Sequence, residues 1–136
     1  MDSDRLERFV TDLNDRHDAI AELIENGELL RRIGKSRLAV HTFAKGARLW
    51  PERRWEFLYY TGSCCVDIGK WIQAARFYGQ ALRLNPGCAH THAGLAECAT
   101  HFERFDEAGQ LVAEALRLDE RCANAWVAWG DLHEKR

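Results

Sequence analysis

The residues of this chain that could bind a metal ion gather in one short stretch, Cys88-Ala89-His90-Thr91-His92. Zinc needs four nitrogen or sulfur ligands in a tetrahedral array, usually as paired ligands separated by a loop. Ligands spaced two residues apart at the start of a helix point in different directions. Cys98 and His101 are three residues apart and would share a helix face. We expect no metal and no cofactor; a metal- or redox-responsive protein is one alternative.

The rest of the sequence shows no arrangement typical of catalysis. It has no recognisable glycine-rich phosphate loop, nucleophile with an adjacent base, or supported carboxylate pair. The net charge is −2, both signs are interspersed, and the basic clusters Arg31–Arg37 and Arg53-Arg54 are short. Such charges are typical of solvated surfaces rather than of nucleic-acid interfaces. We expect a protein that is not an enzyme and does not bind nucleic acid.

The hydropathy of the chain predicts a cytoplasmic protein without membrane contact. Apolar runs are far shorter than the roughly 18 residues of a membrane span. The first residues, Met1-Asp2-Ser3-Asp4, are acidic and lack the apolar segment of a secretory signal. The odd number of cysteines, five, also argues against a disulfide framework.

Two copies of one 34-residue pattern follow each other in Trp55–Cys122. Small, aromatic and cysteine positions recur at this spacing: Gly62 and Ala96, Cys64 and Cys98, Trp71 and Phe105, Ala74 and Ala108, Ala81 and Ala115, Cys88 and Cys122. A fixed period of about 20 to 50 residues is typical of stacked-repeat proteins. Because the cysteines recur with the period, we expect buried structural thiols.

Turn residues divide each copy into two helices. Asn85-Pro86-Gly87 separates the copies, since proline cannot continue a helix and glycine tolerates positive φ. A degenerate copy begins at Ile20, turns at Gly34 and ends at Trp50-Pro51. The expected helices that follow are Trp55–Ile68, Trp71–Leu84, Ala89–Phe102, Phe105–Leu118 and Ala123–Glu134.

The N-terminal segment has no repeat signature. Ser3 is a candidate helix cap, and an apolar stripe follows at helical spacing: Leu6, Phe9, Val10 and Leu13. We expect the polar residues Asn14–Asp18 to break or bend this helix. The segment either covers the apolar face of the first hairpin or pairs two protomers.

The period, the small residues at Gly62, Ala74 and Ala81, and Pro86 after the second helix resemble the tetratricopeptide-repeat (TPR) family. The resemblance implies an all-α fold: a right-handed superhelical stack of antiparallel helix hairpins in a single domain. Its expected parts are an N-terminal helical arm or cap at 1–19, degenerate repeat 1 at 20–54, repeat 2 at 55–88, repeat 3 at 89–122 and a capping helix at 123–136.

By the same resemblance, the first helix of each hairpin lines a concave groove that binds a protein or peptide client. The predicted peptide-binding residues are Tyr59, Ser63, Val66, His90, Ala93, Glu97 and Thr100. The lining continues at Ile24, Glu28 and Arg31 and at Val127 and Asp131. Such a mixed surface suits a peptide with apolar anchors and a flanking basic residue. Alternatively, Tyr59 only packs on a neighbouring hairpin.

One TPR subgroup, the co-chaperones of the large heat-shock proteins, binds a C-terminal carboxylate with Lys, Asn and Arg. The residues at the corresponding positions here cannot bind a carboxylate in that way: Ile24, Glu28, Tyr60, His90 and Gly94. The negative charge of Glu28 would repel such a ligand.

The repeat region resembles the class II chaperones of bacterial type III secretion. The residues that carry this resemblance are Phe57-Leu58, Gly62-Ser63-Cys64, Gly69-Lys70-Trp71, Ala74, Ala96-Glu97-Cys98 and Ala108. It implies a chaperone that keeps hydrophobic secreted translocators soluble and binds a segment of the form Pro-x-Leu-x-x-Pro. A generic TPR scaffold that bridges partners in a larger complex is the alternative.

Overall fold

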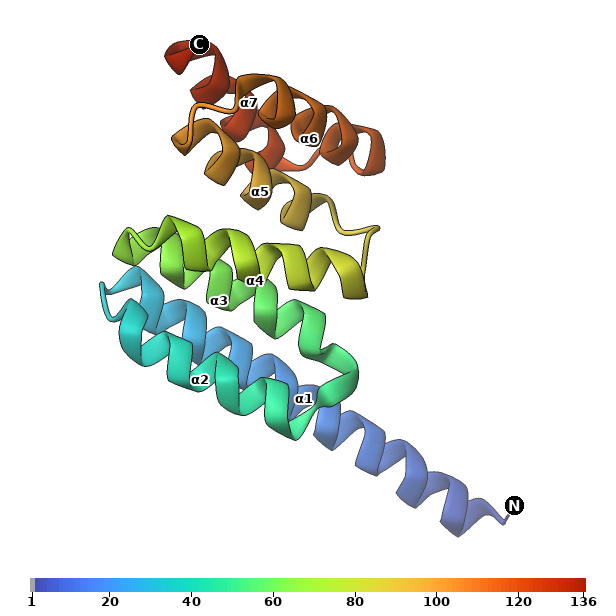
Figure 1. The fold of residues 1–136 in the computed structure, drawn as a ribbon. Helices are drawn as coiled ribbons and strands as arrows, with labels where there is room; N and C mark the ends of the chain where they lie inside the picture. Colours follow the sequence, from blue (N-terminus) through green and yellow to red (C-terminus); the bar gives the residue numbers. More distant parts are fainter. Residues whose placement is uncertain (1) are drawn as a thin grey trace.

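We describe residues 2–136 in a computed structural model, where they form α-helices and one short 3-10 helix but no strand. In chain order the elements are α1 (Ser3–Arg32), α2 (Ser36–Leu49), η1 (Pro51–Arg53), α3 (Arg54–Ile68), α4 (Trp71–Leu84), α5 (Ala89–His101), α6 (Phe105–Leu118) and α7 (Ala123–Lys135). Each α-helix packs against the next one along the chain, and α7 also packs on α5 (Figure 1). The predicted all-α stack of helix hairpins is therefore confirmed.

The predicted helix ends agree with the structure to within one residue in the second and third hairpins. The helix α3 begins at Arg54 instead of Trp55, and α5 ends at His101 instead of Phe102. Gly34 and Gly69 are 35 residues apart instead of 34, and the one extra residue of the first hairpin lies in the connection around η1, where Pro51 begins a 3-10 turn. An insertion in a connection does not disturb the packed helices.

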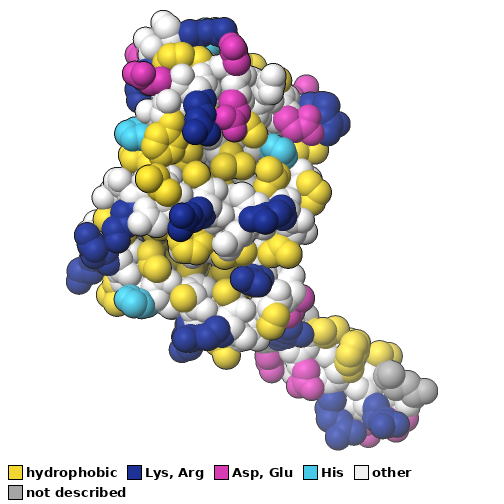
Figure 2. Space-filling view, in the orientation of Figure 1, with side chains coloured by type: hydrophobic (Ala, Val, Ile, Leu, Met, Phe, Trp, Pro, Cys, Tyr) yellow, Lys and Arg dark blue, Asp and Glu magenta, His cyan; other side chains and the backbone are white. Residues whose placement is uncertain are grey.

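The first helix differs from the prediction in two ways. Its N-cap is Asp2 and not Ser3, because the Asp2 carboxylate accepts a hydrogen bond from the Arg5 backbone N–H at 2.7 Å. It also continues through Asn14–Asp18 without a break. Residues 2–19 are exposed to solvent, so their polar side chains stay hydrated and do not compete with the helix. This part of α1 projects from the stack (Figures 1 and 2).

The three turns inside the hairpins have the same hydrogen bonds. The backbone N–H groups of Lys35, Lys70 and Arg104 donate to the carbonyls of Leu30, Cys65 and Ala99, each at 2.8 Å. These six-residue closures define Schellman motifs, which require a left-handed residue. Gly34 and Gly69 supply it with φ of 85° and 84°, and Glu103 supplies it with φ of 62°.

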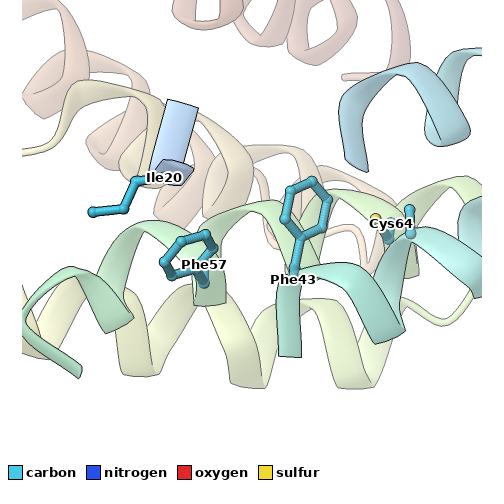
Figure 3. Close-up of a cluster of buried hydrophobic side chains, with 5 residues drawn as sticks. Ile20, Phe43, Phe57 and Cys64 are labelled. Carbon is cyan, nitrogen blue, oxygen red and sulfur yellow. The ribbon is translucent and has the colours of Figure 1, made fainter. Parts of the chain in front are cut away.

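Small residues set the distance between neighbouring helices at three equivalent positions of the repeat. Members of each set are separated by 35 and then 34 residues: Gly27, Gly62 and Ala96; Ala39, Ala74 and Ala108; Gly46, Ala81 and Ala115. The alanines among them are completely buried. A β carbon at Gly27 would collide with the Phe43 ring, and one at Gly46 with the Phe57 ring. Figure 3 shows these two rings in the core with Ile20 and Cys64.

Within residues 2–136, no helix combines the length and the apolar composition that crossing a bilayer requires.

Candidate functional site

The first helices of the repeats, α1, α3 and α5, form a pocket together with α7. Its volume is about 340 Å³. It is lined by Glu28, Arg31, Tyr59, Tyr60, Ser63, Val66, Asp67, Tyr78, His90, Ala93, Gly94, Glu97, Asn124, Val127, Ala128 and Asp131. Because every repeat contributes to one surface, a ligand in this pocket contacts several hairpins at once.

Aromatic rings surround Tyr59 on three sides. Its ring centroid lies 5.3 Å from that of Tyr60, 5.8 Å from that of Tyr78 and 6.1 Å from that of His90. Partial burial raises the pKa of Tyr59, so its hydroxyl is protonated at neutral pH. Tyr59 therefore presents an uncharged ring and a hydroxyl that can donate a hydrogen bond in the pocket.

Tyr78 comes from the second helix of its hairpin and still reaches the pocket. Its ring lies beside Gly62 of α3 and Gly94 of α5, where a β carbon would stand 2.8 Å from Tyr78 Cε1 and 2.7 Å from Tyr78 Cζ, respectively. Its hydroxyl forms a hydrogen bond of 2.9 Å with that of Ser63. The two glycines thus leave room for a ring that joins two repeats beneath the pocket.

Asn124 connects three helices at the rim of the pocket. Its amide nitrogen donates to the Tyr59 hydroxyl at 3.2 Å and lies 3.1 Å from His90 Nδ1. Because Asn124 is exposed, a ligand can replace it as the partner of either side chain. These polar groups of α3 and α5 are thus available for recognition.

Arg31 holds two carboxylates on the other side of the pocket. Its Nε lies 2.6 Å from Asp67 Oδ2, and its Nη1 lies 3.3 Å from Glu28 Oε1. Ser36 also donates to Asp67, at 3.2 Å. The network joins α1, α2 and α3, and it leaves the Arg31 guanidinium paired on both sides.

Glu97 lies half-buried on the pocket wall formed by α5. Burial raises the pKa of its carboxyl, and the charge of Asp131 on α7 raises it further. No ion pair among the described residues involves either Glu97 or Asp131. This side of the pocket therefore carries two carboxylates that form no ion pair, although the charges of Arg31 and Lys135 partly offset the rise in the pKa of Glu97.

The structure places six of the seven predicted binding residues on the pocket: Tyr59, Ser63, Val66, His90, Ala93 and Glu97. Thr100 does not line it, because it is 4 % exposed and its hydroxyl donates to the Ala96 carbonyl at 2.9 Å. Among the flanking residues Glu28, Arg31, Val127 and Asp131 line it, whereas Ile24 packs against the first core cluster. The lining residues that sequence reasoning missed are Tyr60, Asp67, Tyr78, Gly94, Asn124 and Ala128.

The cysteine and histidine side chains of the Cys88–His92 stretch lie in different surroundings. His90 faces the pocket, whereas His92 is buried and its Nε2 lies 3.0 Å from the Pro86 carbonyl oxygen. His101 stacks on Trp71 with centroids 4.2 Å apart, whereas Cys98 is buried. In residues 2–136 no three His, Cys, Asp or Glu side chains are grouped as metal ligands would be.

The thiols of the core are poorly suited to redox chemistry. Burial raises the pKa of Cys64 to about 12 and that of Cys98 to about 12. A reactive cysteine needs thiolate at neutral pH and access to solvent. Cys64, Cys65, Cys98 and Cys122 are buried, as the sequence predicted, whereas Cys88 is half-buried.

The tetratricopeptide-repeat family model matches residues 68–129 of this chain. Solved structures also align over most of its length. The second TPR domain of human RPAP3, in complex with the HSP70 peptide SGPTIEEVD, is 17% identical and has a TM-score of 0.71. That alignment covers 86% of this chain and 97% of the RPAP3 domain's chain.

Two further structures show the same arrangement. The type III secretion chaperone SycD of Yersinia enterocolitica, in complex with a peptide of the translocator YopD, is 17% identical. The TM-score is 0.72, and the alignment covers 87% of this chain and 92% of the SycD chain. The TPR domain of Arabidopsis OM64 is 16% identical, with a TM-score of 0.74. That alignment covers 88% of this chain and 98% of the OM64 domain. At these identities the likeness establishes the fold.

Proposed function

The chain contains tetratricopeptide repeats in a domain of the TPR fold, and on that premise we propose that it binds an extended segment of a client protein in the pocket of α1, α3, α5 and α7. The observation that carries the proposal is the pocket itself, which combines partly buried tyrosine rings, polar groups and apolar side chains on one concave surface. Pockets of this kind bind ligands through a few apolar anchors and a few placed polar groups.

The client that we propose is a hydrophobic translocator of type III secretion, with the chain acting as its cytoplasmic chaperone. The residue pattern of the repeat region supports this choice, and SycD has the same fold. Tyr59, Ala93 and Val127 lie at one equivalent position of successive repeats and line the pocket. They form an apolar row that suits the leucine of a Pro-x-Leu-x-x-Pro segment.

A fluorescence-anisotropy titration with a labelled Pro-x-Leu-x-x-Pro peptide tests the proposal. The informative variant is Val127→Arg, because Val127 lines the pocket and is 63% exposed, so a long side chain fits without disturbing the core. Gln110→Arg on the exposed surface of α6 is the matched control. We expect saturable binding by wild type and control, and its loss in Val127→Arg. Absence of binding to the folded wild type would refute the proposal.

A generic scaffold is the second candidate function. The observation in its favour is a second apolar surface on α7, where Trp126 and Trp129 are 51% and 46% exposed. A scaffold needs two contact surfaces, whereas a chaperone needs one that keeps its client soluble. Co-expression with an insoluble translocator distinguishes them, because only a chaperone increases the soluble fraction of the client.

We also propose that the projecting part of α1 pairs two protomers. Its apolar side chains are about half exposed and share one helix face: Leu6 51%, Phe9 55%, Val10 46% and Leu13 47%. Spacings of three and four residues are those of a helix–helix seam. Figure 2 shows hydrophobic side chains along one edge of this projection. A second copy of the same helix would cover them.

A further inference from the structure

Negatively charged side chains outnumber positively charged ones in the lining of the pocket. Four carboxylates line it, those of Glu28, Asp67, Glu97 and Asp131, against the single guanidinium of Arg31. That guanidinium is already paired with Asp67 and Glu28. The carboxylates of Glu97 and Asp131 are therefore the unpaired charges of the described pocket.

These carboxylates belong to a regular row. Glu28, Ser63, Glu97 and Asp131 are separated by 35, 34 and 34 residues, so they occupy one equivalent position on successive first helices. The apolar row of Tyr59, Ala93 and Val127 lies four residues earlier on the same helices, which is about one helical turn away. An extended segment in the pocket thus meets an apolar row on one side and an acidic row on the other.

The surroundings of Glu97 make its negative charge energetically costly. The side chain is half-buried, and Asp131 lies close enough to raise its pKa. A carboxylate removed from water is stabilised by a cation with which it can form a hydrogen bond. The ring faces of Tyr59 and Tyr60 add a second attraction, because aromatic faces hold ammonium and guanidinium groups.

Two second helices of the stack, α2 and α4, carry positive charge only. The helices α2 and α4 carry Arg37, Lys45, Arg48, Arg76 and Arg83 and no acidic residue. Figure 2 shows basic side chains over this part of the molecule. A positively charged segment is therefore repelled by α2 and α4 and attracted to the pocket.

We propose that the client segment carries a lysine or arginine side chain, which lies between Tyr59, Glu97 and Asp131 while a neighbouring apolar residue lies on the row of Tyr59, Ala93 and Val127. This inference rests on the proposed function, because it names the chemistry of the segment that the same pocket binds. The structure of the second TPR domain of RPAP3 contains a peptide of the opposite charge, SGPTIEEVD. Here such a peptide would meet unpaired carboxylates.

A panel of labelled Pro-x-Leu-x-x-Pro peptides tests the inference, with Lys, Gln or Glu at each x position in turn and Ser at the others. At one position at least, the Lys peptide should bind about tenfold more tightly than the Gln peptide, as expected for a hydrogen bond to a charged group. The Glu peptide should bind more weakly than both. The Lys preference should shrink as salt is added.

The variant Glu97→Gln/Asp131→Asn identifies the groups responsible, because both changes keep the side-chain shape and remove the charge. It should bind the Lys and Gln peptides equally, with the Gln affinity unchanged. The control Glu22→Gln/Glu25→Gln removes two exposed charges of α1 outside this pocket and should retain the preference. Equal binding of Lys and Gln peptides by the wild type would overturn this inference alone. Binding of no peptide would refute the proposed function as well.

Discussion

The ring of Tyr78 lies where a side chain at Gly62 would have to be: a β carbon there would stand 2.8 Å from Tyr78 Cε1. Real β carbons do not approach a neighbouring atom so closely. The same ring also excludes a side chain at Gly94. The Tyr78 ring can therefore occupy this position only because both Gly62 and Gly94 lack a side chain, and the spacing of α3 and α5 depends on the same two glycines.

Replacing Gly62 by alanine should destabilise the protein. The new methyl group would push against the buried Tyr78 ring, and overpacking of this kind costs about 1–3 kcal/mol. Gly79→Ala is the control, since a β carbon at Gly79 would meet no atom within 4 Å. It should stabilise the helix by about 0.5–1 kcal/mol. Urea unfolding of both variants tests this, and equal effects would contradict the packing described here.

The turn at Glu103 should carry strain that its equivalents avoid. Its φ of 62° lies in the left-handed region, which costs a residue with a β carbon about 1–2 kcal/mol. Glu103→Gly should therefore raise the free energy of unfolding by about 0.5–1 kcal/mol after the entropic cost of glycine. Gly69→Ala, at the equivalent turn, should lower it. A destabilising Glu103→Gly would show that the Glu103 side chain is needed there.

Much of the fold follows from the repeated pattern. Small residues that recur every 34 or 35 residues, such as Ala39, Ala74 and Ala108, must lie at helix contacts, and they are completely buried. The uninterrupted α1 was harder to predict. Polar segments such as Asn14–Asp18 often end a helix in a packed protein, but here the surrounding solvent satisfies their side chains. The sequence pattern does not reveal that the helix projects.

The sequence predicted the lining residues that come from the first helices of the hairpins. The residues of α3 and α5 follow from helical spacing, whereas Tyr78 reaches the pocket from a second helix through the space above Gly62 and Gly94. That geometry depends on three helices together. Thr100 does not line the pocket, because its hydroxyl donates to the Ala96 carbonyl of its own helix and the residue is buried. Asn124 is brought to His90 by the packing of α7 on α5.

The stability of the protein should depend on pH through Glu97. Because burial raises the pKa of Glu97 above its usual value of 4.5, the folded state binds more protons than the unfolded state between the two values. The free energy of unfolding then falls as pH rises through this range. Glu97→Gln removes this cost and should stabilise the protein at pH 7.5 but not below about pH 4.

Urea unfolding of Glu97→Gln at the two pH values measures this dependence. Glu25→Gln, which removes an exposed charge from α1, controls for the change in net charge. The control should change stability by less than about 0.5 kcal/mol at either pH. A Glu97→Gln variant that is less stable than wild type at pH 7.5 would mean that the carboxylate has a stabilising partner.

The projecting part of α1 should determine whether the free protein is a dimer or a monomer. Phe9→Glu introduces a charge into the apolar stripe and should convert dimers to monomers. Thr11→Glu adds the same charge on the opposite face of the helix and should leave the mass unchanged. Multi-angle light scattering measures both. Monomers in the wild type, or equal masses for both variants, would contradict pairing through this helix.

The most direct test of client binding in the groove is an NMR titration of the isotope-labelled protein with the Lys-containing Pro-x-Leu-x-x-Pro peptide. The account predicts that backbone amide shifts change around Tyr59, Ala93, Glu97 and Val127. A second, more apolar hollow of about 480 Å³, lined in part by Ile72, Leu95 and Phe102, should show no change. Changes confined to that second hollow, or no changes at saturating peptide, would contradict the claim that the concave pocket binds the client.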